Sequence, residues 1–103
     1  MQHFQKTSEF HSLEGYVQSI ANHYFLAINN LKVDREDSES NSYIMRVRNA
    51  YLELDGVMRK FINNDFFYED YPFWWKRYYS KATYYRLKRK SMLKFKEAFD
   101  GGQ

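Results

Sequence analysis

The chain has 103 residues, a net charge of +3 and no cysteine, and 20% of its residues are aromatic. This length favours one domain with a single core, and the lack of cysteine excludes disulfides and thiolate metal sites. One proline and four glycines are few for the many turns of an all-β protein, so we expect an all-α fold of about four helices.

The first ten residues lack the basic and apolar regions of a signal peptide. No apolar run approaches the ~18 residues of a membrane span. Together with the absence of cysteine, these features predict a cytoplasmic protein with no membrane partner.

The first predicted helix runs from residue 7 or 8 to residue 30. Ser8 can cap its start, and Leu13, Val17 and Ile20 recur at helical spacing. Residues 32–42 follow, with one apolar residue among many Asp, Glu and Ser residues, and predict an exposed acidic loop.

The second predicted helix covers residues 42–62, where apolar residues recur three or four apart from Ile44 to Met58 and beyond. Gly56 lies inside this pattern and costs about 1 kcal/mol relative to alanine, which a long packed helix can tolerate. We expect the helix to end at the polar residues 63–65.

The last two predicted helices differ in length. A short one runs from residue 72 to residue 78 or 79, because Pro72 suits a first helical turn. A long one begins at Ser80, whose hydroxyl can cap the free amides of the first turn, and ends near residue 98 or 99, before the sequence DGG.

These elements predict a single helical domain over residues 1–103. Residues 1–41 form its N-terminal helix and acidic loop. Residues 42–103 hold the other three helices, and the order of a short helix, a turn and a long helix at their end predicts a helix-turn-helix region. The helix over residues 7–30 is the surface that we expect to join two copies in a homodimer, because a helix-turn-helix over the later residues does not need it locally.

Charge is distributed unevenly along the chain. Residues 1–55 carry five Lys or Arg and eight Asp or Glu, and residues 56–103 carry eleven and five. Residues 74–96 hold nine basic residues and no acidic one. Such clustering is typical of a protein that binds a polyanion.

A helical wheel separates this charge from a core face in the last helix. The predicted core face consists of Tyr84, Leu87, Ser91, Phe95 and Ala98, flanked by Met92 and Phe99. The opposite face consists of Arg86, Arg89, Lys90, Leu93 and Glu97. Lys88 falls inside the apolar arc, and we expect its ammonium to reach solvent at an edge.

A short helix, a tight turn and a long basic helix indicate a helix-turn-helix. In that motif the first half of the second helix enters the major groove, where Arg and Lys donate to guanine or phosphate. Basic residues on the preceding short helix are placed to contact phosphate. The predicted DNA-binding residues are Lys76, Arg77, Ser80, Lys81, Thr83, Arg86, Arg89 and Lys90.

Residues 79–95, YSKATYYRLKRKSMLKF, resemble the recognition segment of phage-associated regulators of the ArpU and RinA type, which are similar to the sigma-70 region 4 helix-turn-helix. The matching positions are Ser80, Thr83, Tyr84, Tyr85, Arg86, Leu87, Lys88, Met92 and Phe95. The resemblance is confined to the C-terminal half, and the family's first motif helix is aliphatic rather than aromatic. It implies a bacterial transcription regulator that binds double-stranded DNA, with RNA polymerase or another protein as a further partner.

Two other interpretations stay open. The chain could be a helical protein–protein interaction module whose aromatic surface docks a protein partner. Trp74 and Trp75 could instead stack on single-stranded nucleic acid, although no β-rich pattern supports such a domain.

His3, His11 and His23 lack a metal-ligand spacing, and no phosphate-binding loop or nucleophile motif is present. We therefore predict no enzyme activity, no metal and no cofactor.

Overall fold

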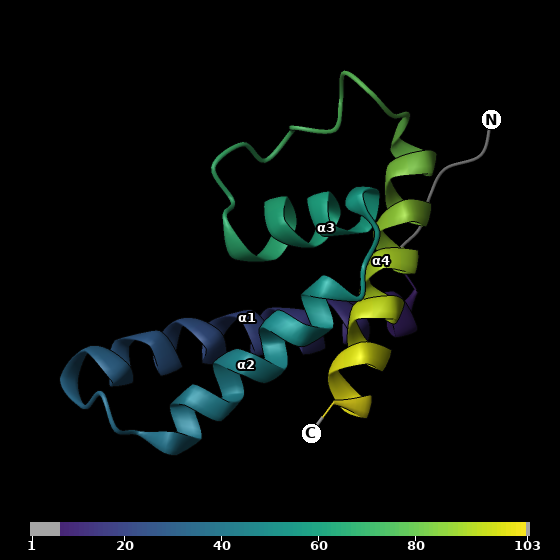
Figure 1. Ribbon diagram of the computed structural model, residues 1–103. Coiled ribbons are helices and arrows are strands. Elements are labelled where there is room, and N and C mark those ends of the chain that lie inside the picture. Colours follow the sequence, from purple (N-terminus) through teal and green to yellow (C-terminus); the bar gives the residue numbers. More distant parts are fainter. Residues whose placement is uncertain (1–6, 103) are drawn as a thin grey trace.

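The computed structural model describes residues 7–102, and within them every regular element is a helix (Figure 1). The elements are α1 (Ser8–Val33), α2 (Ser38–Leu52), α3 (Gly56–Ile62), the π-helix η1 (Asn63–Phe67) and α4 (Lys81–Gly101). No strand occurs in this part of the chain, so the predicted all-α fold with four α-helices is confirmed.

Each α-helix begins at a residue whose side-chain oxygen accepts a hydrogen bond from an amide of the first turn, as N-caps do. The caps are Thr7 for α1, Asp37 for α2, Asp55 for α3 and Ser80 for α4. The Ser80 cap was predicted from the sequence, and its Oγ accepts from the amide of Thr83 at 3.2 Å.

The predicted helix over residues 42–62 is wrong, because two helices occupy it. The apolar spacing continues through residues 53–55, but the carboxylate of Asp55 accepts from the amide of Met58 at 2.8 Å and starts a new helix. The predicted acidic loop over residues 32–42 is also too long. Asp37 caps α2 at residue 38, so only residues 34–37 lie between α1 and α2.

The predicted short helix over residues 72–79 is wrong as well. Residues 68–80 form an irregular link that arches over α3 and returns to the start of α4 (Figure 1). Its turns are closed by backbone hydrogen bonds such as Trp74 to Tyr71 and Tyr78 to Trp75. A helix-turn-helix is therefore not confirmed, because the element before α4 is a link of turns.

Tertiary contacts of the tryptophans explain the irregular link. The indole of Trp74 donates to Asp65 at 2.8 Å, and the ring of Trp75 stacks on Tyr84 at a centroid distance of 4.3 Å. Neighbouring side chains point about 100° apart in a regular helix. Docking both rings against the start of α4 thus favours turns over helix.

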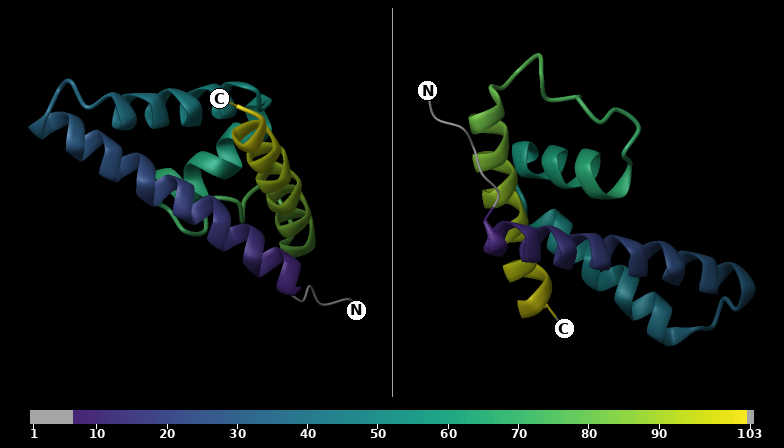
Figure 2. Two further views of the ribbon diagram at one scale, coloured as in Figure 1. Left: turned by 90° about the horizontal axis from the view of Figure 1, so that it is seen from below. Right: turned by 180° about the vertical axis from the view of Figure 1, so that it is seen from behind.

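The helices pack as a hairpin crossed by a third helix. α1 and α2 run antiparallel, α4 crosses both, and α3 packs against α4 (Figures 1 and 2). The radius of gyration is 14.9 Å. A compact chain of this length has a value of about 13 Å. The difference follows from the far end of the α1–α2 hairpin, which projects from the body (Figure 2).

The core draws on every helix. Its most deeply buried side chains include Phe10 and Val17 of α1, Val47 of α2, Ile62 of α3 and Met92 and Phe95 of α4. The apolar face of α1 is therefore buried within the chain itself. α1 is thus part of the core, and its predicted role in joining two copies in a homodimer stays a prediction.

Candidate nucleic-acid interface

α4 separates a buried face from an exposed one, close to the predicted wheel. Its buried residues are Tyr84, Lys88, Ser91, Met92, Phe95 and Phe99. Leu87 and Ala98 are only half-buried, whereas Lys88 is buried. The buried face is therefore rotated about the helix axis from the predicted face toward Lys88. The outer face keeps the predicted basic character.

The prediction that Lys88 reaches solvent is wrong. Lys88 is 8% exposed, and its ammonium lies 3.0 Å from a carboxylate oxygen of Glu14 on α1 and 3.5 Å from one of Asp65 on η1. Burial of a lysine is tolerated when its charge is paired and hydrogen-bonded. Lys88 thus fastens three helices together and is not part of the basic surface.

Asp65 is the centre of this buried network. Its two carboxylate oxygens accept hydrogen bonds from the indole of Trp74 at 2.8 Å and from the hydroxyl of Tyr84 at 2.5 Å. Burial raises the pKa of Tyr84 well above its usual range, and the hydrogen bond to Asp65 raises it further. The network, formed by Glu14, Asp65, Trp74, Tyr84 and Lys88, docks the link against the start of α4.

Three cations form a stripe along the outer face of α4. Arg86, Lys90 and Lys94 lie four residues apart, so they span about 12 Å of helix on one side. All three are exposed, and none makes an ion pair or hydrogen bond with another residue of the described part. Together with Met58 and Arg89 they line a shallow hollow beside α3.

The remaining predicted cations lie at the start of α4 and before it. Lys76 and Arg77 are exposed on the link, and the ammonium of Lys76 lies 4.4 Å from the ring centre of Phe73. Lys81 is exposed in the first turn of α4. Arg89 is exposed but forms an ion pair of 2.6 Å with Glu9 of α1, so a polyanion would have to compete for it.

The two hydroxyl residues of the prediction serve the helix cap. Ser80 Oγ accepts from the amide of Thr83 and donates to Thr83 Oγ1 at 3.0 Å. Their polar atoms are thus already engaged with each other. They are poorer candidates for contacts with bases than the cations are.

Sequence analysis missed two groups of residues. Lys94 continues the spacing of Arg86 and Lys90, so the helical period could have identified it. The partners of Lys88 could not be identified in this way, because Glu14 and Asp65 come from distant parts of the sequence.

Among the histidines, His11 and His23 belong to no cluster able to hold a metal within residues 7–102, and His3 lies outside the described residues.

No helix in residues 7–102 combines the length and apolar character needed to span a membrane. Comparisons with protein-family models, with curated proteins and with solved structures find no match for this chain. The resemblance of residues 79–95 to phage regulators therefore stays a prediction.

Proposed function

We propose that the chain is a DNA-binding protein of the transcription-regulator kind that holds double-stranded DNA against the outer face of α4. One observation carries the proposal: Arg86, Lys90 and Lys94 form an exposed stripe with no partner among the described residues. An α-helix of about 10–12 Å diameter fits a major groove about 12 Å wide.

Within this proposal the cations have different roles. Arg86 is a base-reading candidate, since a guanidinium can donate two hydrogen bonds to guanine. Lys76, Arg77 and Lys81 would contact phosphates beside the groove. The resemblance to phage and mobile-element regulators supports a regulatory role, with RNA polymerase or another protein as a further partner. A homodimer would enlarge the small footprint of a single recognition helix to two half-sites.

A salt titration of DNA binding tests the proposal. The variant Arg86→Gln/Lys90→Gln is compared with Lys32→Gln/Arg35→Gln, which removes the same charge from exposed positions at the end of the α1–α2 hairpin. Affinity for duplex DNA is measured by fluorescence anisotropy at about 50 and 200 mM salt. Each lost phosphate contact lowers the slope of log K against log salt by about 0.9.

We expect the α4 variant to lose the slope of about one phosphate contact, that of Lys90, and the hairpin variant to keep the slope of the unmodified protein. Equal losses in both variants would mean that net charge alone attracts DNA. Absence of binding to duplex DNA at the lower salt concentration would refute the proposal.

A second candidate function is a protein-interaction module. Large rings are exposed on or beside the link: Tyr68, Tyr71, Phe73 and Tyr78 are 56–76% exposed. Exposed aromatic side chains are frequent at protein interfaces. The variant Tyr71→Ser/Phe73→Ser should leave duplex DNA affinity unchanged if these rings dock a protein, and a single-stranded DNA arm of the titration tests stacking on bases.

A further inference from the structure

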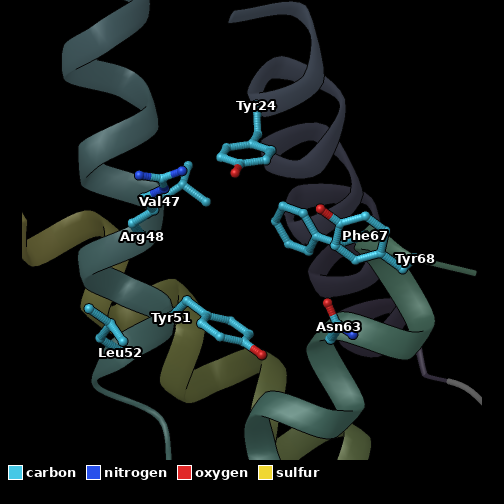
Figure 3. Close-up of a pocket in the computed structure, with 8 residues that line it drawn as sticks. All are labelled: Tyr24, Val47, Arg48, Tyr51, Leu52, Asn63, Phe67 and Tyr68. Carbon is cyan, nitrogen blue, oxygen red and sulfur yellow. The ribbon is translucent and has the colours of Figure 1, made fainter. Parts of the chain in front are cut away.

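A cavity of about 260 Å³ lies between α2 and η1, over the side of α1 (Figure 3). Both α2 and η1 pack against α1. Residues that define the cavity are Tyr24 of α1, Arg48 and Tyr51 of α2, Asn63 and Phe67 of η1, and Tyr68. An apolar cavity of about 150 Å³ in a protein holds benzene, so this one has room for an aromatic ring with a substituent.

Flat aromatic faces form much of the wall. Tyr24 and Phe67 meet edge to face at a centroid distance of 5.5 Å, and Phe25 supports both rings from the side. Edge-to-face packing fixes the orientation of such rings. A planar apolar guest can therefore lie against walls that are already in place.

Polar groups converge on the same space. Figure 3 shows the hydroxyls of Tyr24 and Tyr51 and the amide of Asn63 directed toward the gap between α2 and η1. None of these side-chain groups has a hydrogen-bond partner within the described residues. A few convergent polar groups on a mostly apolar wall are characteristic of small-molecule sites.

Arg48 gives the cavity its charge. It is the one ionisable lining residue besides the tyrosines, no carboxylate lines the cavity, and the guanidinium makes no ion pair within the described part of the chain. Arginine binds carboxylates through paired N–H donors. The charge of the cavity thus favours an anionic guest.

The π-helix supplies independent support. η1 brings Asn63, Phe67 and the following Tyr68 to the cavity. The amide of Tyr68 donates to the carbonyl of Asn63 at 2.8 Å, and this hydrogen bond closes the π-helical turn. π-helical turns are rare and occur frequently at functional sites. Here the wider turn forms the wall opposite α2.

We propose that this cavity binds a small planar aromatic carboxylate, with its ring lying against the wall that Tyr24 and Phe67 form and its carboxylate on Arg48. The ring is held by the apolar walls, and the tyrosine hydroxyls and Asn63 donate to the carboxylate. This site is separate from the α4 stripe, so its existence does not depend on DNA binding.

Fluorine NMR with fluorobenzoate as the probe tests the proposal, and its neutral methyl ester tests the charge requirement. Three proteins are compared: the unmodified chain, Arg48→Gln, and the control Arg35→Gln, which removes an arginine from the exposed turn between α1 and α2. Amide shifts of Asn63, Phe67 and Tyr68 report whether the probe occupies the cavity.

We expect fluorobenzoate to bind the unmodified chain and Arg35→Gln alike, and to bind Arg48→Gln about tenfold more weakly, which corresponds to about 1.4 kcal/mol. The ester should bind about tenfold more weakly than the acid and be insensitive to Arg48→Gln. No saturable binding at millimolar probe, binding that leaves the η1 amides unmoved, or equal affinity for acid and ester would each overturn the proposal.

Discussion

The substitution Lys88→Met should strongly destabilise the fold. Methionine keeps the length and apolar stem of lysine but removes the charge that faces Glu14 and Asp65. The side chains of Lys88 and Asp65 are 10% and 7% exposed, so the carboxylate of Asp65 would stay buried without its cation. Loss of one partner from a buried ion pair costs about 3–5 kcal/mol.

The lower end of that range applies here. Asp65 keeps its hydrogen bonds from Trp74 and Tyr84, and Glu14 is 20% exposed and remains partly hydrated. We therefore expect a loss of about 3 kcal/mol. In a domain of this size 1 kcal/mol corresponds to about 4–8 °C in Tm, so Tm should fall by about 12–24 °C.

Urea unfolding followed by circular dichroism and by tryptophan fluorescence measures this loss. Trp74 and Trp75 are the two tryptophans of the chain, so fluorescence reports on the docked link directly. The matched control is Lys90→Met on the exposed face of α4, which should change stability by less than about 0.5 kcal/mol.

A double-mutant cycle isolates the pair. Asp65→Asn alone should also be destabilising, and the double variant Lys88→Met/Asp65→Asn should be more stable than the sum of the two single losses predicts. Strictly additive losses, or a Lys88→Met loss no larger than that of Lys90→Met, would refute the assignment of Lys88 to a buried network.

Three further outcomes are expected. Phe95→Ala removes a fully buried ring and should cost about 3–5 kcal/mol in urea unfolding, whereas Leu87→Ala, at a half-buried position, should cost less. The amide and hydroxyl of Ser40 hold the pKa of Asp37 below its usual range, so Asp37 stabilises the fold above about pH 4 and loses this effect as the pH falls; Asp37→Asn should flatten the acid dependence of the urea midpoint. Burial raises the pKa of Tyr84, so its contribution to the free energy of unfolding should be fully present below about pH 10 and decrease as the pH rises further. Tyr84→Phe should therefore weaken the alkaline loss of stability in the same assay.

The elements that sequence analysis predicted well are those with local causes. The period of apolar residues predicts α1 and α4, and the Ser80 hydroxyl marks the start of α4 because the cap bond involves only the next three residues. The exposed basic stripe follows from the same period. Local chemistry is sufficient for these features because each depends on residues within about one helical turn.

Features that depend on distant contacts could not be predicted. The break between α2 and α3 is an exception, because its cause is local: Asp55 caps α3 through the amide of Met58, but the apolar spacing that continues through residues 53–55 favoured one long helix. Lysine is a residue type usually found at the surface, and Lys88 is buried only because α1 and η1 bring carboxylates to it. The link fails to become a helix because its tryptophans dock on side chains of other elements.

The density of rings beside the basic residues has a structural cause. Trp74, Tyr79 and Tyr84 all approach the buried ring of Phe61, at centroid distances of 5.0, 5.6 and 5.7 Å, and Trp75 stacks on Tyr84. The contacts with Phe61 and Tyr84 give these rings a structural role that needs no base to stack on.

Arg86, Lys90 and Lys94, the cations of the α4 stripe, remain exposed. Under the proposed DNA binding, phosphate contact by the α4 stripe would account for its charge without any role for the clustered rings, and binding would be dominated by counterion release. Sequence preference would then rest on Arg86, the one guanidinium of the stripe, since lysine ammonium groups bind phosphate as point charges. On this reasoning Lys90→Gln should weaken binding to all duplexes alike, whereas Arg86→Gln should also reduce the difference between preferred and random duplexes in the same anisotropy titration.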